Sequence, residues 1–108
     1  MANVFITGGG RGIGLELARQ LIEQPASRIA RVYITTRSKS DEAQALFFTH
    51  PDRLTILECH DVTDQATVRL LAIELDKKLG DKGLDILINN IGVSIGYTVP
   101  SFDWRTYS

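Results

Sequence analysis

Five glycines lie within seven consecutive residues near the amino terminus, in the run Gly8-Gly9-Gly10-Arg11-Gly12-Ile13-Gly14. An apolar segment, residues 3–7, precedes this run, and a segment with helical periodicity follows it. The first N–H groups of a helix have no partner within the helix, and the helix dipole makes that end positive. Glycines at such a corner let a phosphate approach the backbone closely. The run therefore predicts a phosphate or pyrophosphate site made by the backbone amides of residues 8–14.

Several kinds of nucleotide-binding loop are rich in glycine, and their spacing distinguishes them. Gly9 and Gly14 have the spacing of a P-loop, but Leu15 and Glu16 follow where that loop needs Lys and then Ser or Thr. The dehydrogenase pattern GxGxxG fails because leucine occupies both positions at which its third glycine would fall. A GxGxG pattern over residues 10–14 also occurs in methyltransferase-type sites, but the acidic residue that these sites usually carry after the next strand is absent.

Short apolar runs alternate with segments of helical period along the chain, which indicates βαβ units and a parallel sheet. We expect strands at residues 3–7, 31–36, 54–59 and 84–88. We expect helices at residues 12–24, 38–48 and 64–79, the third of them capped by Thr63. The expected apolar stripe of the first helix is Ile13, Leu17 and Leu21, flanked by Ala18 and Ile22. That of the third helix is Val68, Leu71, Ala72, Leu75 and Leu79, and it is widened by Leu70 and Ile73, which suggests packing against more than the sheet.

The spacing TGxxxGxG does fit the glycine run, through Thr7, Gly8, Gly12 and Gly14. Two further features follow later strands, namely Asp61-Val62 after the third and Asn89-Asn90-Ile91-Gly92 after the fourth. In this order and context the three features resemble the motifs of the short-chain dehydrogenase/reductase family, whose last motif reads Asn-Asn-Ala-Gly. Within the family, the carbonyl-reductase, sniffer-like branch is the one that this chain most resembles, through the segments VFITGGGRGIGLELARQL and GLDILINN. The resemblance covers about residues 1–95.

The resemblance implies an α/β fold, the N-terminal half of a three-layer, Rossmann-type doubly wound parallel sheet with strand order 3-2-1-4. We expect residues 1–92 to form a dinucleotide-binding half-domain and residues 93–108 an irregular tail that stops before the catalytic region. The fourth strand is then an open edge at which the chain could self-associate. We expect the isolated chain to be marginally stable.

The end of the second expected strand predicts which dinucleotide is bound. Sites selective for NAD(H) place an acid there for the ribose 2′-hydroxyl, whereas this strand ends Thr35-Thr36-Arg37. A guanidinium suits the extra phosphate of NADP(H), so we expect NADP(H) rather than NAD(H). The resemblance places Arg11 near the same phosphate, and Ser38 and Lys39 could assist. The alternative is that Arg37 is only a solvated charge at a strand end.

The resemblance also implies contacts to the adenosine of the cofactor. Asp61 would hold the adenine amino group beside the backbone of Val62. Asn89, Asn90 and Gly92 would line the ribose and fix the fourth strand. Ile91 departs from the alanine of the family and would either crowd the cofactor or pack into the core.

The catalytic residues that the resemblance implies are absent from this sequence of 108 residues. The family uses a tyrosine as general acid and base, with a lysine four positions later that lowers its pKa, and a serine that orients the carbonyl. Tyr33 and Tyr97 are followed four positions later by Arg37 and Ser101, and Tyr107 stands next to the last residue. We therefore nominate no catalytic residue, and expect Lys77, Lys78 and Lys82 to lie on the wrong side of the site.

We accordingly expect the NADP(H)-binding portion of an oxidoreductase that moves a hydride between NADPH and a small carbonyl or alcohol. The alternatives are a stand-alone NADP(H)-binding regulatory module and a nonfunctional truncated product. A shift in thermal stability with NADPH would favour the module, and the lack of any cooperative transition would favour the product.

Composition narrows the class of partner. The 108 residues carry a net charge of −1, which gives no electrostatic reason to expect nucleic acid or an anionic membrane. Residues 1–7 do not resemble a signal peptide, and the single cysteine, Cys59, fits a reducing compartment and a buried thiol. We expect a cytoplasmic protein. His60 has no second ligand at metal-site spacing, so we expect no metal site.

Overall fold

The computed structural model describes residues 1–37, 40–59 and 64–90. Every strand and helix expected from the sequence is present, with ends that differ by at most three residues. In chain order the elements are β1 (Ala2–Thr7), α1 (Gly12–Glu23), β2 (Ile29–Thr36), α2 (Asp41–Thr49), β3 (Leu54–Glu58), α3 (Gln65–Leu79), a 3-10 turn η1 (Gly80–Lys82) and β4 (Ile86–Asn89).

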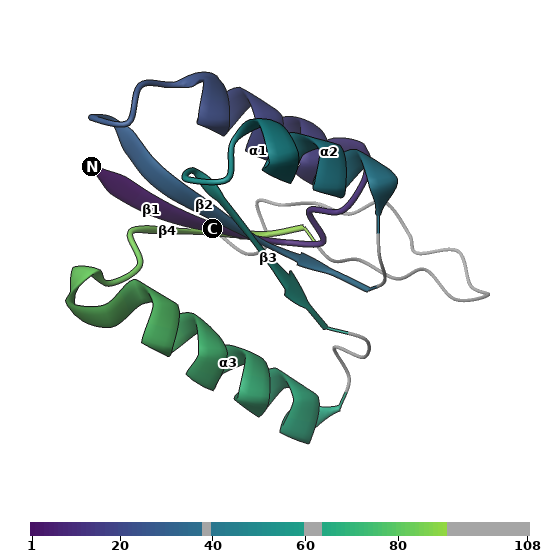
Figure 1. The fold of residues 1–108 in the computed structure, drawn as a ribbon. Coiled ribbons are helices and arrows are strands. Elements are labelled where there is room, and N and C mark those ends of the chain that lie inside the picture. The colour runs from purple at the N-terminus through teal and green to yellow at the C-terminus, as the bar shows by residue number, and fades with distance from the viewer. Residues whose placement is uncertain (38–39, 60–63, 91–108) are drawn as a thin grey trace, which may run out of the picture.

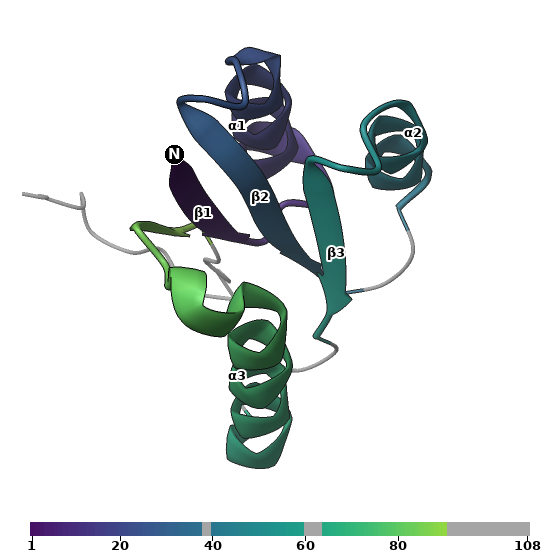
Figure 2. The ribbon, with the colours of Figure 1, turned by 60° about the vertical axis from the view of Figure 1, so that its left-hand side comes forward.

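The four strands form one parallel sheet in the order β3-β2-β1-β4, as expected. β1 lies between β2 and β4. Its Ile6 is paired with Ile34 of β2 on one side and with Ile88 of β4 on the other. Helices α1 and α2 cover one face of the sheet, and α3 lies on the other (Figures 1 and 2). The fold is therefore three-layered, and all four strands have their carboxyl ends at the same edge.

The face under α1 and α2 holds the larger part of the core. Alternate residues of the strands point to this face, because side chains in a strand alternate in direction. They meet small and branched side chains from both helices, and the cluster comprises Val4, Ile6, Val32, Ile34 and Leu54 from the strands, Ala18 and Ile22 from α1, and Ala43 from α2, with Ile29 at the start of β2.

The face under α3 has a smaller core. Phe5, Tyr33 and Leu57 from the strands are buried against Leu79, with Leu71 and Leu75 of α3 packed beside them. The second apolar stripe of α3 faces away, since Leu70 is 68% exposed and Ile73 is 48% exposed. In the described residues this stripe does not make the additional packing that its width suggested.

Four local expectations were wrong. Val68 and Ala72, expected in the apolar stripe of α3 that packs on the sheet, are exposed. Ile13 is 74% exposed, because α1 turns Gly14, Ala18 and Ile22 toward the sheet at a spacing of four residues. The cap of α3 is Asp64, whose carboxylate accepts a hydrogen bond from the N–H of Ala66 at 3.2 Å; Thr63 lies outside the described residues. Helix α2 begins at Asp41 rather than at residue 38, because the hydroxyl of Ser40 caps it.

One expectation from the single cysteine is confirmed by the structure. Cys59 is 2% exposed, which confirms a buried thiol. Among the described residues, no helix combines the length and the apolar character needed to cross a bilayer.

Candidate functional site

The glycine run forms the corner between β1 and α1, at the carboxyl edge of the sheet. Gly8 and Gly12 have φ angles of 72° and 63°. Residues with a Cβ rarely adopt this left-handed conformation, so both glycines are required by the turn itself. The corner is thus the strand-to-helix turn that the sequence predicted.

Close packing requires glycine at other positions of the run. A Cβ on Gly14 would stand 2.2 Å from the carbonyl oxygen of Gly8 and 2.7 Å from the side-chain amide of Asn90. A Cβ on Gly9 would stand 2.5 Å from that of Ile34, and one on Gly10 would stand 2.9 Å from a methyl group of Thr36. The first turn of α1 therefore lies directly on the loop, and the loop lies directly on β2.

Helix α1 differs from α2 and α3 at its amino end. Ser40 caps α2 and Asp64 caps α3, whereas Arg11 at the cap position of α1 makes no side-chain cap hydrogen bond. The first turn of α1 also contains no acidic residue. Its N–H groups have no partner within the helix, and the helix dipole adds positive potential. This end of α1 is suited to receive an anion.

The end of β4 holds the loop in place. The hydroxyl of Thr7 accepts a hydrogen bond from the backbone N–H of Asn90 at 2.9 Å and lies 3.2 Å from the side-chain oxygen of Asn89. The side-chain amide of Asn90 donates to the carbonyl oxygen of Gly8 at 3.1 Å. The structure thus brings Thr7, Gly8, Asn89 and Asn90 together, and Asn90 fixes the conformation of the loop.

Two cations flank the loop. Arg11 follows Gly10, whose α-carbon packs on Thr36, and Arg37 comes directly after Thr36. Both side chains are exposed, and neither forms a salt bridge or hydrogen bond with another described residue. Two guanidinium groups are therefore free to bind an anion where the loop meets the end of β2.

Sequence analysis missed three residues that support the loop. The side chain of Thr35 accepts a hydrogen bond from the N–H of Gly8 at 3.0 Å, and its carbonyl accepts one from the N–H of Gly9 at 2.9 Å. The hydroxyl of Ser40 donates to the carbonyl of Gly10. The third is Gly9, whose N–H was expected to bind phosphate; its packing against Ile34 and its hydrogen bond to Thr35 support the loop instead. A small residue at every position from 8 to 10 was the only available signal.

Arg19, on the outer side of α1, is already paired. It forms salt bridges with Glu16, three positions before it, and with Glu23, four positions after it. The hydrogen bond from Arg19 holds the pKa of the Glu16 carboxyl at about 2. Arg19 is therefore not a third free cation on α1.

Of the remaining residues named in the sequence analysis, some lie outside the described residues and others lie at the opposite edge of the sheet. Asp61, Val62 and Gly92 lie outside the described residues, as do Ser38 and Lys39. Lys78 and Lys82 lie at the end of α3 and in η1, which precede β4 and so stand at the amino edge of the sheet, opposite the glycine loop. They are on the wrong side of the site, as expected.

Comparison with known proteins agrees with this geometry. The chain matches the family model for short chain dehydrogenase over residues 2–106. It is 34% identical over 105 residues to human Short-chain dehydrogenase/reductase 3, an alignment that covers 94% of this chain and 32% of that protein. The NADPH-bound carbonyl reductase from chicken fatty liver is 33% identical, with a TM-score of 0.76, and the match covers 92% of this chain and 40% of that one.

The carbonyl reductase Sniffer of Drosophila melanogaster is 28% identical, with a TM-score of 0.77, over 89% of this chain and 38% of that one. The expected likeness to the sniffer-like branch is confirmed. The chain thus spans between about a third and two fifths of the length of these relatives.

Proposed function

Because this chain belongs to the short-chain dehydrogenase/reductase family, we propose that it binds NADP(H) as the cofactor portion of an oxidoreductase. The full activity would move a hydride between NADPH and a small carbonyl or alcohol. The chain spans about a third of the length of its human relative. The activity of the whole protein is therefore part of the proposal.

The uncapped amino end of α1 carries this proposal. Residues 10–14 supply backbone N–H groups there, because the N–H groups of Gly8 and Gly9 already donate to Thr35. No Cβ obstructs the approach, since Gly12 has open space on its Cβ side. A pyrophosphate fits such a corner because its charge matches the dipole and its oxygens accept from several N–H groups. When bound, the dinucleotide supplies the hydride chemistry, and the residues of this chain bind and orient it.

Arg11 and Arg37 would select NADP(H) over NAD(H). Two unpaired guanidinium groups beside the end of β2 suit a 2′-phosphate, which accepts bidentate hydrogen bonds. Glu58 is paired in register with Thr36, but it ends the neighbouring strand β3. It is therefore not at the end of β2, where an NAD-selective site carries its acid.

The adenosine half of the cofactor would lie along the carboxyl edge. We propose that Asp61 and Val62 contact the adenine and that Asn89, Asn90 and Gly92 line the ribose. The hydrogen bonds of Asn90 to Thr7 and Gly8 support a second task for it, which is to hold β4 against the loop. The tyrosine, lysine and serine of the family's catalytic machinery have no counterpart in this chain, so no residue here is assigned a catalytic role.

NADPH binding should raise the thermal stability of the 108-residue chain. At a concentration about 100 times the dissociation constant, binding to the folded state contributes ~2.7 kcal/mol to the free energy of unfolding. We expect a clear rise in Tm with NADPH and a smaller one with NADH at the same concentration. Arg37→Asp should weaken NADPH binding by ~10-fold or more and bring NADH binding closer to it, because a carboxylate repels the phosphate and accepts from the hydroxyl.

Arg69→Asp provides the matched control. Arg69 is an exposed arginine on α3, on the other face of the sheet, so the same change in charge should leave the ratio of NADPH to NADH affinity unaltered. A chain that folds cooperatively and yet shows no shift with either dinucleotide would contradict the proposed function. If Arg37→Asp and Arg69→Asp changed the ratio of NADPH to NADH affinity equally, the role of Arg37 in cofactor selection would be contradicted, but the proposed binding of a dinucleotide would not.

We also propose that the isolated chain self-associates through β4. In the described residues β4 is the last strand of the sheet, and Ile86 and Leu87 are 42% and 58% exposed. An edge strand with apolar side chains pairs readily with a second copy, and charged side chains prevent this. Leu87→Lys should therefore shift the chain toward monomer in sedimentation velocity at equal concentration. Phe48→Lys, at a 75% exposed site on α2, should not; an equal effect there would contradict association through β4.

A further inference from the structure

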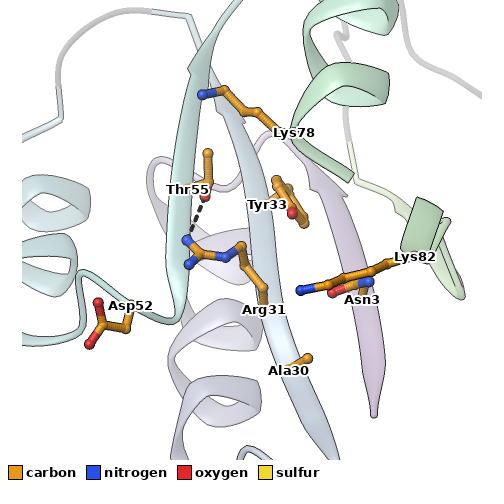
Figure 3. A pocket seen from close by; sticks show the side chains of 8 residues that line it. All are labelled: Asn3, Ala30, Arg31, Tyr33, Asp52, Thr55, Lys78 and Lys82. Atoms are coloured by element: carbon orange, nitrogen blue, oxygen red, sulfur yellow. Dashed lines mark hydrogen bonds between the residues drawn. The ribbon is translucent and has the colours of Figure 1, made fainter. Parts of the chain in front are cut away.

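A cavity of about 450 Å³ lies at the amino edge of the sheet, on the face that α3 covers. Its walls come from the first halves of β2 and β3, from the last turn of α3 and from η1 (Figure 3). The glycine loop lies at the opposite edge, so this cavity has no part in the dinucleotide site. Its volume suits a small molecule rather than a macromolecular surface.

Positive charge predominates in this cavity. Arg31, Lys78 and Lys82 line it together with one carboxylate, Asp52, so its walls carry a net charge of +2. None of these four side chains forms a salt bridge within the described part of the chain. In Figure 3 the carboxylate of Asp52 lies at the margin, directed away from the three cations. The three cations therefore line the cavity from different sides, and none of them has an internal counter-ion within the described part of the chain.

Hydroxyl groups complete the lining. The guanidinium of Arg31 donates to the hydroxyl oxygen of Thr55 at 2.9 Å, which leaves the Thr55 proton free to point elsewhere. Tyr33 is 4% exposed, with its ring packed among Phe5, Leu57 and Leu79, and its hydroxyl has no hydrogen-bond partner among the described residues. The Tyr33 oxygen is not one of the fully buried atoms that lack a partner, so it is accessible from the cavity. Both hydroxyls can donate to an acceptor held in the cavity.

We propose that this cavity binds a phosphate monoester, with the phosphoryl group held by Arg31, Lys78 and Lys82 and by the hydroxyls of Tyr33 and Thr55. The net charge of the walls matches a phosphate dianion. A guanidinium supplies two parallel N–H donors to a phosphate, while ammonium groups supply charge. Inorganic phosphate has the same chemistry, and the volume beyond the phosphoryl group distinguishes the two, because only an ester fills it.

The test is a titration of the ¹⁵N-labelled 108-residue chain, at constant ionic strength, with phenyl phosphate, inorganic phosphate and citrate in separate series. We expect saturable amide shifts around Arg31, Tyr33 and Thr55 with both phosphates, and tighter binding of the ester. Lys78→Gln should weaken binding by ~10-fold, and Tyr33→Phe should weaken it to a smaller degree. Shifts in residues 8–14 report the glycine loop separately and should not respond to Lys78→Gln.

Lys77→Gln is the matched control. Lys77 and Lys78 are neighbours in the last turn of α3, where either charge interacts favourably with the helix dipole. Lys77, however, does not line the cavity. Only Lys78→Gln should change phosphate affinity. Absence of saturable shifts in the cavity, equal losses from both lysine variants, or saturation by citrate alone would overturn the proposal. Equal affinity for inorganic phosphate and the ester would overturn the assignment to an ester.

Discussion

Replacing Gly14 with alanine should reduce NADPH affinity by ~100-fold or more. The new Cβ would stand 2.2 Å from the carbonyl oxygen of Gly8 and 2.7 Å from the amide nitrogen of Asn90, so the loop must move away from the first turn of α1. A displaced loop loses at least two charge-assisted hydrogen bonds to the pyrophosphate, each worth ~1.5 kcal/mol or more. Two such losses correspond to about a hundredfold change in the dissociation constant. Overpacking should also cost ~1–3 kcal/mol of folding free energy.

Gly80→Ala separates the two effects. Gly80 has a φ of 58° and open space on its Cβ side, and it follows α3, far from the glycine loop. With a ψ of −132°, Gly80 lies in a backbone region that residues other than glycine rarely adopt, so alanine should cost ~1–3 kcal/mol there, a loss of stability similar to that expected at Gly14. NADPH affinity, measured by calorimetry well below the Tm of each variant, should be unchanged. If Gly14→Ala bound NADPH as well as Gly80→Ala does, the loop would not be the pyrophosphate site.

The parts of the fold that the sequence predicted best are those governed by local periodicity. The alternation of strands and helices followed from short apolar runs, whereas the order 3-2-1-4 followed from the family resemblance that the three spaced motifs carry. The carboxyl-edge location of the loop and of Asn90 followed because every motif came directly after an expected strand. Backbone constraints of this kind are local, so a single sequence is enough to reveal them.

Contacts across the fold were harder to predict. The periodicity of α1 did not reveal that Gly14, rather than Ile13, faces the sheet, because the helix enters at a tight corner set by Gly8 and Gly12. Nor did any local pattern show that Thr35 and Ser40 hold the loop through hydrogen bonds to Gly8 and Gly10. Those partners are about thirty positions apart, and their proximity depends on how β2 pairs with β1.

The two faces of the sheet contribute unequally to stability. The cluster under α1 and α2 includes five strand residues that are completely buried, Val4, Ile6, Val32, Ile34 and Leu54. The face under α3 leaves Leu87 and Ile73 more than two fifths exposed. Since buried apolar area is the main source of folding free energy, the helices α1 and α2 should provide most of the stability of this chain.

Ile34→Ala should therefore destabilise the chain by ~2–5 kcal/mol. Ile34 is 0% exposed, lies at the centre of the α1/α2 cluster, and supports the glycine loop through its contact with Gly9. The lost methyl and methylene groups would leave a cavity that the paired strands on both sides cannot close. A loss of this size is a large part of the total stability of an ordinary domain, which is ~5–15 kcal/mol. Urea denaturation followed by circular dichroism measures it.

Ile73→Ala removes the same atoms from the other face and serves as the control. Ile73 is 48% exposed on α3, so its truncation should change the free energy of unfolding by less than ~1 kcal/mol. The difference between the two variants measures how far stability is concentrated under α1 and α2. Equal losses in the two variants would contradict this distribution of stability. They would mean that the outward stripe of α3 is buried in solution and that the α3 face contributes more to the free energy of unfolding than its exposed side chains indicate.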